Sequence, residues 1–264
     1  MNDIIDTRRF TLFFKKTIVE RPIQTIGVTG LLLVLSLMMY TIAKKSMGFG
    51  AAQNLTFIWG LVGGDFFLTS FAFGYFGTNA SGSSYLTLPV SYFEKWLTCI
   101  IIVGILYPII FILFFHTVDA IFISSYHHSL DPSSIFFKEQ YESAFTFNLN
   151  GILAWRVYAL CFFFVGVMLT GGLYFNKAPL IKTLIAFCIV AAIIFGLNWA
   201  VAMALFRNVK DAGPYDHVTL AVGRETGVLL LPTGLEKFFH VAISYAIPAF
   251  LWLVPLIRLK EKEF

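Results

Sequence analysis

The chain has 264 residues, of which 58% are hydrophobic and only 13% charged, and its formal net charge is +4. This composition excludes an ordinary soluble domain, because too few polar side chains remain to cover a surface that faces water. We therefore expect one all-α integral membrane domain over residues 1–264, with about six spans of about 20 apolar residues each.

Residues 1–22 have the pattern of an amphipathic helix. One helical face carries apolar side chains at positions 10, 13, 14 and 18 together with Thr17, whereas four basic residues lie off that face: Arg8, Arg9, Lys15 and Lys16. Such a helix lies in the membrane interface, where apolar side chains enter the bilayer and basic ones attract anionic lipid. Membrane lipids are thus its expected partners.

The apolar runs predict spans at about 23–43, 54–76, 97–115, 151–174, 180–206 and 238–257. The second span is unusual because Gly60 and Gly64 form a small-xxx-small face, which packs closely against a helix of this chain or of a second copy. Asp65 lies beside them, and an ionisable group inside a span is a functional hypothesis by default. Three roles for Asp65 fit this position: it lines a translocation path, takes part in proton coupling, or packs against a neighbouring helix.

A short amphipathic insert at 85–96, YLTLPVSYFEKW, separates the second and third spans. Pro89 stops the incoming chain, Ser91 is a suitable N-cap, and Glu94 stands three residues later as its capping-box partner. We expect a small helix that begins near Val90 at the membrane surface and runs into the next span. A similar LLLPTGLEKFF at 229–239 also precedes a span, either as a convenient helix entry, as an ancient repeat, or because both lie on one side of the membrane.

Two connections are longer. The more polar sequence of residues 116–150 predicts a loop. We interpret four residues in this loop as solvated rather than as a metal site: His116, Asp119, His127 and His128. In residues 207–237, HVTLAV and GVLLLP predict two strands of a small β-hairpin. The modest excess of basic residues beside the expected inner span ends places both termini in the cytoplasm, the insert on the same side and the hairpin outside.

The insert and the overall order of elements resemble the membrane subunits of ABC type-2 exporters in bacteria. LPVSYFEKW is similar to the Leu-Pro-x-Ser-x-x-Glu-Lys signature of permeases related to gliding-motility and multidrug exporters. The resemblance implies a protein of the bacterial inner membrane, paired as a homodimer or with another permease. It also implies a coupling helix that docks on a separate ATP-binding subunit and contains Leu88, Pro89, Ser91, Phe93, Glu94, Lys95 and Trp96, with Glu94 and Lys95 in polar contact with that subunit.

No catalytic residues are expected in this chain. It has no phosphate-binding G-x-x-x-x-G-K-[ST] loop, so ATP would be bound and hydrolysed on the partner subunit. We also expect no metal, cofactor or nucleic-acid partner here, and Cys99, Cys161 and Cys188 fall in apolar runs without a pairing pattern. The alternative function is a non-transporting membrane anchor or assembly factor that recruits an extracytoplasmic partner. An intramembrane enzyme would need a reactive constellation that the sequence does not show.

Overall fold

The computed structural model describes residues 5–77, 79–206, 208–213, 217–222, 225–230 and 232–262. The chain is mostly helical, and five of its helices are long and apolar enough to cross a membrane: Ile23–Met47, Tyr92–Ser129, Ile152–Tyr174, Pro179–Leu205 and Thr233–Glu261. The expectation of a helical multi-pass membrane protein is therefore confirmed.

The helical elements follow the chain in this order: α1 (Thr7–Glu20), η1 (Ile23–Gly27), α2 (Val28–Met47), α3 (Phe49–Ile58), η2 (Trp59–Gly63), α4 (Gly64–Thr69), η3 (Gly74–Gly77), α5 (Asn79–Leu86), α6 (Tyr92–Cys99), η4 (Ile100–Leu106), α7 (Tyr107–Ser129), α8 (Phe137–Ser143), α9 (Ile152–Tyr174), α10 (Pro179–Leu205), α11 (Thr233–Val241), η5 (Ala242–Ala246) and α12 (Ile247–Glu261). The segments η1, η2, η4 and η5 are π-helical, and η3 is a 3₁₀ helix.

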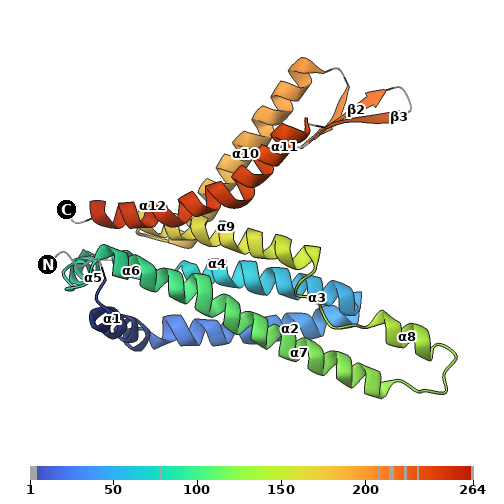
Figure 1. Cartoon of the computed structure of the whole chain (residues 1–264), viewed down its shortest axis with the longest axis horizontal. Coiled ribbons are helices and arrows are strands. Elements are labelled where there is room, and N and C mark those ends of the chain that lie inside the picture. Colours follow the sequence, from blue (N-terminus) through green and yellow to red (C-terminus); the bar gives the residue numbers. More distant parts are fainter. Residues whose placement is uncertain are drawn as a thin grey trace.

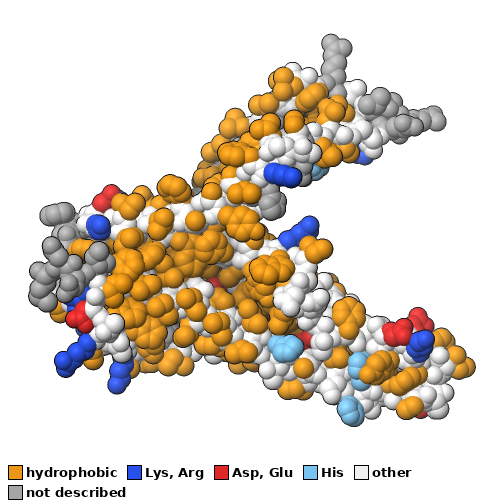
Figure 2. Space-filling view, in the orientation of Figure 1, with side chains coloured by type: hydrophobic (Ala, Val, Ile, Leu, Met, Phe, Trp, Pro, Cys, Tyr) orange, Lys and Arg blue, Asp and Glu red, His pale blue; other side chains and the backbone are white. Residues whose placement is uncertain are grey.

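Most of these helices form one bundle (Figure 1). The helices α2, α3–α4, α6–α7 and α9 run alongside one another, and α12 packs on α9. By contrast, α10 and α11 extend away from the bundle and carry a small sheet. Both ends of the chain lie at the same end of the bundle, together with α1, α5 and the start of α6; we call it the termini end. Hydrophobic side chains cover most of the visible face of the bundle, as a lipid-facing surface requires (Figure 2).

The second expected span, at 54–76, forms the helix α3–η2–α4, which ends at Thr69. It is not among the five strongly apolar helices. Its place in the bundle explains this composition, because Gln53 and Asp65 are buried on it together with Phe57 and Leu61. Gln53 and Asp65 therefore face the protein interior, while the exposed large side chains of this helix, Leu55, Ile58, Trp59 and Phe67, are apolar.

The third expected span, at 97–115, is part of a longer helix. Residues Tyr92–Ser129 form one helical run of 38 residues, about 57 Å long at the usual rise of about 1.5 Å per residue. Pro108 stands in its interior directly after the π-helical η4, an arrangement that accommodates the missing proline N–H. The loop expected over 116–150 therefore begins only after Ser129.

The added helical turns are held by Asp119, which is fully buried. Its Oδ1 accepts hydrogen bonds from the Tyr40 hydroxyl at 2.6 Å and from Gln53 Nε2 at 2.8 Å. Its Oδ2 accepts from the Phe147 N–H at 2.7 Å. This carboxylate thus joins α2, α3 and α7 to the segment before α9, and its interpretation as a solvated loop residue is wrong.

The histidines near it lie apart from this network. His116 is exposed on α7, whereas Asp119 one turn later faces the protein interior. His127 Nε2 lies 2.9 Å from the Ala144 carbonyl oxygen, and its ring stacks on Tyr141. These residues are therefore on or against α7 rather than in a free loop.

The expected hairpin is part of a three-stranded antiparallel sheet in the order β1-β2-β3. Its strands are β1 (Val209–Ala212), β2 (His217–Val222) and β3 (Glu225–Leu230). β3 begins two residues earlier than GVLLLP predicts, because Thr226 and Glu225 pair with the end of β2. Residues 223–224 of the expected connection lie outside the described residues. Asn198 Nδ2 on α10 donates to the Ala212 carbonyl at 3.0 Å and ties the sheet to that helix.

The two similar Leu-Pro segments start helices at opposite ends of the molecule. α6 begins at the termini end, whereas α11 begins beside the sheet (Figure 1). Each is followed by a π-helical segment and then by a helix with proline at its second position, Pro108 or Pro248. This placement favours a shared way of entering a membrane helix and argues against both segments lying on one side.

We expect Asp119→Ala to lower the free energy of unfolding by about 3 kcal/mol, because two buried donors and one part-buried donor lose this acceptor at once. Thermal unfolding of the purified protein in detergent measures the effect. Asp131→Ala is the matched control, since Asp131 lies exposed in the loop after α7. Equal unfolding temperatures for the two variants would contradict the structural role of Asp119.

Candidate functional site

The start of α6 has the predicted cap. Ser91 is the N-cap, and its Oγ accepts from the Glu94 N–H at 3.2 Å. In return, Glu94 Oε2 accepts from the Ser91 N–H at 2.9 Å. The sequence pattern therefore predicted this helix start correctly, and α6 continues directly into η4 and α7, as expected of a helix that runs into the next span.

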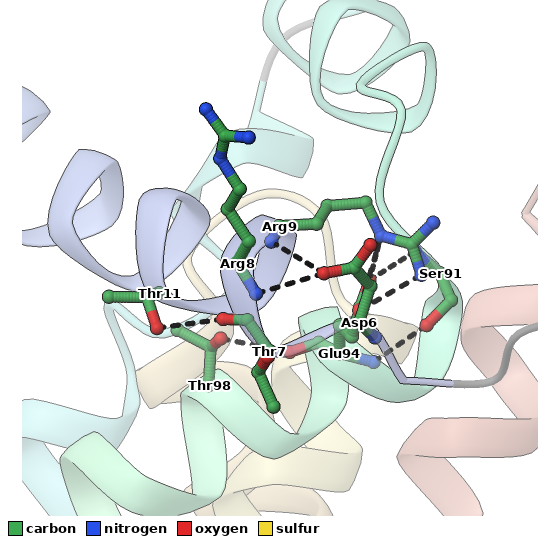
Figure 3. A network of polar contacts seen from close by, with 8 residues as sticks. All are labelled: Asp6, Thr7, Arg8, Arg9, Thr11, Ser91, Glu94 and Thr98. Atoms are coloured by element: carbon green, nitrogen blue, oxygen red, sulfur yellow. Dashed lines mark hydrogen bonds and ion pairs between the residues drawn. The ribbon is translucent and has the colours of Figure 1, made fainter.

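The Glu94 carboxylate also binds the start of α1 (Figure 3). Arg9 Nε donates to Glu94 Oε2 at 2.8 Å, and Arg9 Nη2 donates to Oε1 at 2.9 Å. The Asp6 N–H donates to the same Oε1 at 2.9 Å, while the Asp6 side chain caps α1 by accepting from the N–H groups of residues 8 and 9. One fully buried carboxylate thus fastens two helix starts to each other.

The Lys95 side chain also makes its contacts inside the protein. Its side chain is 1% exposed, and Nζ donates to the Leu86 carbonyl at 3.0 Å. Nζ also lies 5.3 Å from the ring centroid of Tyr85, a cation–π contact. Tyr85 lies outside the spans, and burial raises the pKa of its phenol well above the ordinary value, so this ring stays neutral. Neither Lys95 nor Glu94 offers a side chain to a partner in this structure.

The other predicted coupling residues divide between internal contacts and the surface. Trp96 Nε1 donates to the Trp252 carbonyl at 2.8 Å and ties α6 to α12. Phe93 is half-buried with its ring centroid 5.3 Å from that of Trp96, and Leu88 packs against the core. Pro89 is exposed.

Sequence reasoning missed the helix α5, whose N-A-S-G-S-S start has low helix propensity. Together with the turn after it, α5 presents exposed residues at the termini end, among them Ser83, Ser84, Thr87 and Pro89. We call these four residues the α5 surface. Within residues 81–91, these four are the exposed positions and therefore the most open to a partner.

Gly60 and Gly64 do pack closely, and they do so within the chain. A Cβ at Gly60 would lie 2.2 Å from the Phe111 ring, and a Cβ at Gly64 would lie 2.0 Å from the Tyr107 hydroxyl. That hydroxyl donates to the Gly60 carbonyl at 2.7 Å. The small-residue face of the second helix is therefore occupied by aromatic side chains of α7.

Asp65 stands directly after this face and the π-helical η2, and it is fully buried. Its Oδ2 accepts from the Cys161 thiol at 3.3 Å. Its Oδ1 has no hydrogen-bond partner among the described residues. Asp65 also lines a cavity of about 210 Å³ whose wall includes Tyr158, Phe162 and Trp252.

The fold defines a multi-pass helical membrane protein with a small sheet at one end. No family model, curated protein or solved structure matches the chain. Two places in it concentrate buried polar groups whose geometry favours a function: the α1–α6 junction around Glu94 and the cavity beside Asp65.

We expect Glu94→Gln to release α1 from α6, because a neutral amide cannot hold the Arg9 guanidinium in a paired geometry. Limited trypsin digestion in detergent should then cleave faster after the exposed Lys15 and Lys16. Glu139→Gln on the exposed surface of α8 is the control and should leave the rate unchanged. If Glu94→Gln is cleaved at the wild-type rate, the junction does not hold α1.

Proposed function

We propose that this chain is the membrane-spanning subunit of an ATP-driven exporter of the ABC type-2 class. It would work as a homodimer or with another permease, and separate ATP-binding subunits would bind and hydrolyse the nucleotide. The support is the Leu-Pro-x-Ser-x-x-Glu-Lys signature, whose serine and glutamate form a complete capping box at the start of a long helix.

The observation that carries the proposal is that the start of α6 is joined to two other helices and continues into a long helix. α6 is the first part of a helical run of 38 residues. Glu94 joins its start to α1, and Trp96 joins it to α12. A partner that displaces this end therefore moves three elements together, and the long helix transmits the movement across the membrane.

The contact with the ATP-binding subunit is made by the α5 surface and the neighbouring start of α1. Glu94 and Lys95 act differently from what the resemblance implies, because both are buried. They fix the position of the coupling segment, while the exposed residues around Thr87 and Pro89 meet the partner.

The proposed topology has α3–η2–α4 as the sixth crossing. From Phe49 to Thr69 it extends about 30 Å at about 1.5 Å per residue, which matches the hydrocarbon core of a bilayer. An even number of crossings leaves both ends of the chain on one side, in agreement with their common place at the termini end (Figure 1). This side is the cytoplasmic side of a bacterial inner membrane, and α1 lies in its interface with the predicted apolar face turned inward.

A second candidate is a non-transporting anchor or assembly factor. The observation that favours it is β3, an edge strand of the sheet with exposed Val228, Leu229 and Leu230. An exposed apolar edge strand can pair with a strand of another protein. In this case the opposite side of the molecule from the α5 surface would carry the function.

We expect the pair of substitutions Ser83→Arg and Thr87→Arg to abolish co-purification with the proposed ATP-binding subunit when the two are expressed together, because two bulky charges would occupy the contact surface. The pair Ser133→Arg and Ser143→Arg, on exposed positions near α8, is the matched control. Both double variants should unfold at the wild-type temperature. Retention of the ATP-binding subunit by the α5 variant would contradict the proposed contact.

A further inference from the structure

The cavity beside Asp65 has the composition of a cation site. Asp65 contributes a carboxylate in the interior of the bundle, and its Oδ1 lacks a hydrogen-bond partner among the described residues. A lone buried carboxylate is costly unless a proton or a positive charge neutralises it. The cavity therefore supplies both the space and the electrostatic reason for a cation.

The rest of the wall distinguishes between kinds of cation. Metal ions such as Ca²⁺ and Mg²⁺ need several oxygen ligands, whereas within the described ranges no group of three His, Cys, Asp or Glu side chains could hold a metal ion. The wall is instead apolar and aromatic, with Leu61, Val165, Tyr158, Phe162 and Trp252. Aromatic faces attract organic ammonium groups and leave room for their apolar substituents.

Trp252 is held firmly in this wall. Its indole N–H donates to the Phe162 carbonyl at 2.8 Å, and the two rings stack with centroids 4.8 Å apart. Two glycines make room for it, because a Cβ at Gly104 would lie 2.4 Å from the indole and one at Gly166 would lie 2.9 Å from it. A preorganised aromatic wall needs little rearrangement to receive a ligand.

Trp252 also connects the cavity to the termini end. Its carbonyl accepts the hydrogen bond from Trp96 on α6, and its ring lines the cavity. One residue of α12 thus contacts both α6 and the cavity that Asp65 also lines.

We infer that the cavity between α4, α9 and Trp252 binds an organic ammonium cation, with Asp65 as the counter-charge. The inference rests on the proposed function and deepens it, because it names amphipathic amines and quaternary ammonium compounds as the cargo class. The site lies inside the bundle, next to the helix that the coupling segment would move.

The test uses the purified full chain in detergent, without any ATP-binding subunit, and tritiated benzyltrimethylammonium as the probe. This quaternary cation keeps its charge at every pH and is small enough for the cavity. Saturable binding should be displaced by the unlabelled cation. The neutral alcohol 2-methyl-1-phenyl-2-propanol, which has nearly the same shape, should be at least about ten-fold weaker as a competitor, since it lacks the charge.

Asp65→Asn should weaken binding of the cation at least about ten-fold, while Asp131→Asn in the exposed loop should leave it unchanged. Equal displacement by the cation and the alcohol, or wild-type affinity in Asp65→Asn, would overturn the inference. The wild-type competition decides even if Asp65→Asn does not fold, because it needs no variant.

Failure of the cation site and failure of the proposed exporter function give different results. A chain that associates with the ATP-binding subunit but shows no preference for the cation would contradict only the cargo class. A chain that prefers the cation but binds no ATP-binding subunit would contradict the exporter and leave the cation site in place.

Discussion

The structure at the termini end depends on one buried carboxylate. Glu94 accepts hydrogen bonds from its own helix cap, from the backbone at Asp6 and from the Arg9 guanidinium. Because a buried carboxylate is stable only when its oxygens are satisfied, this residue requires α1 to lie where it does. The amphipathic helix is thereby coupled to a helix that crosses the whole bundle, and the same short segment reaches α12 through Trp96.

The bundle itself is organised around its least apolar helix. α3–η2–α4 brings Gln53 and Asp65 into the interior, where the glycines at 60 and 64 allow aromatic side chains of α7 to approach its backbone. Gln53 Nε2 donates both to Asp119 Oδ1 and to the Phe145 carbonyl. Among the described residues only Oδ2 of Asp65 accepts a hydrogen bond, and for this reason Asp65 is the residue on which the proposed cation site depends.

The sequence predicted the features that depend on local patterns. The face of α1 with Phe13 is turned inward, and its predicted basic positions are exposed except for Arg9. The capping box at Ser91 is present. Features that depend on contacts between distant residues were not predictable, since Arg9 and Glu94 are 85 positions apart. The extension of α7 was missed for the same reason, because Asp119 looks solvated until its three donors from other segments are placed around it. α5 was missed because its small polar residues resemble a loop.

We propose that the termini end couples this chain to ATP hydrolysis on a separate subunit. The most direct measurement is ATP turnover by the proposed ATP-binding subunit in proteoliposomes, with and without this chain. Turnover should rise when the chain is present, and Glu94→Gln, which loosens the junction, should lose most of this stimulation. Turnover that is the same with and without the chain would contradict the proposed coupling.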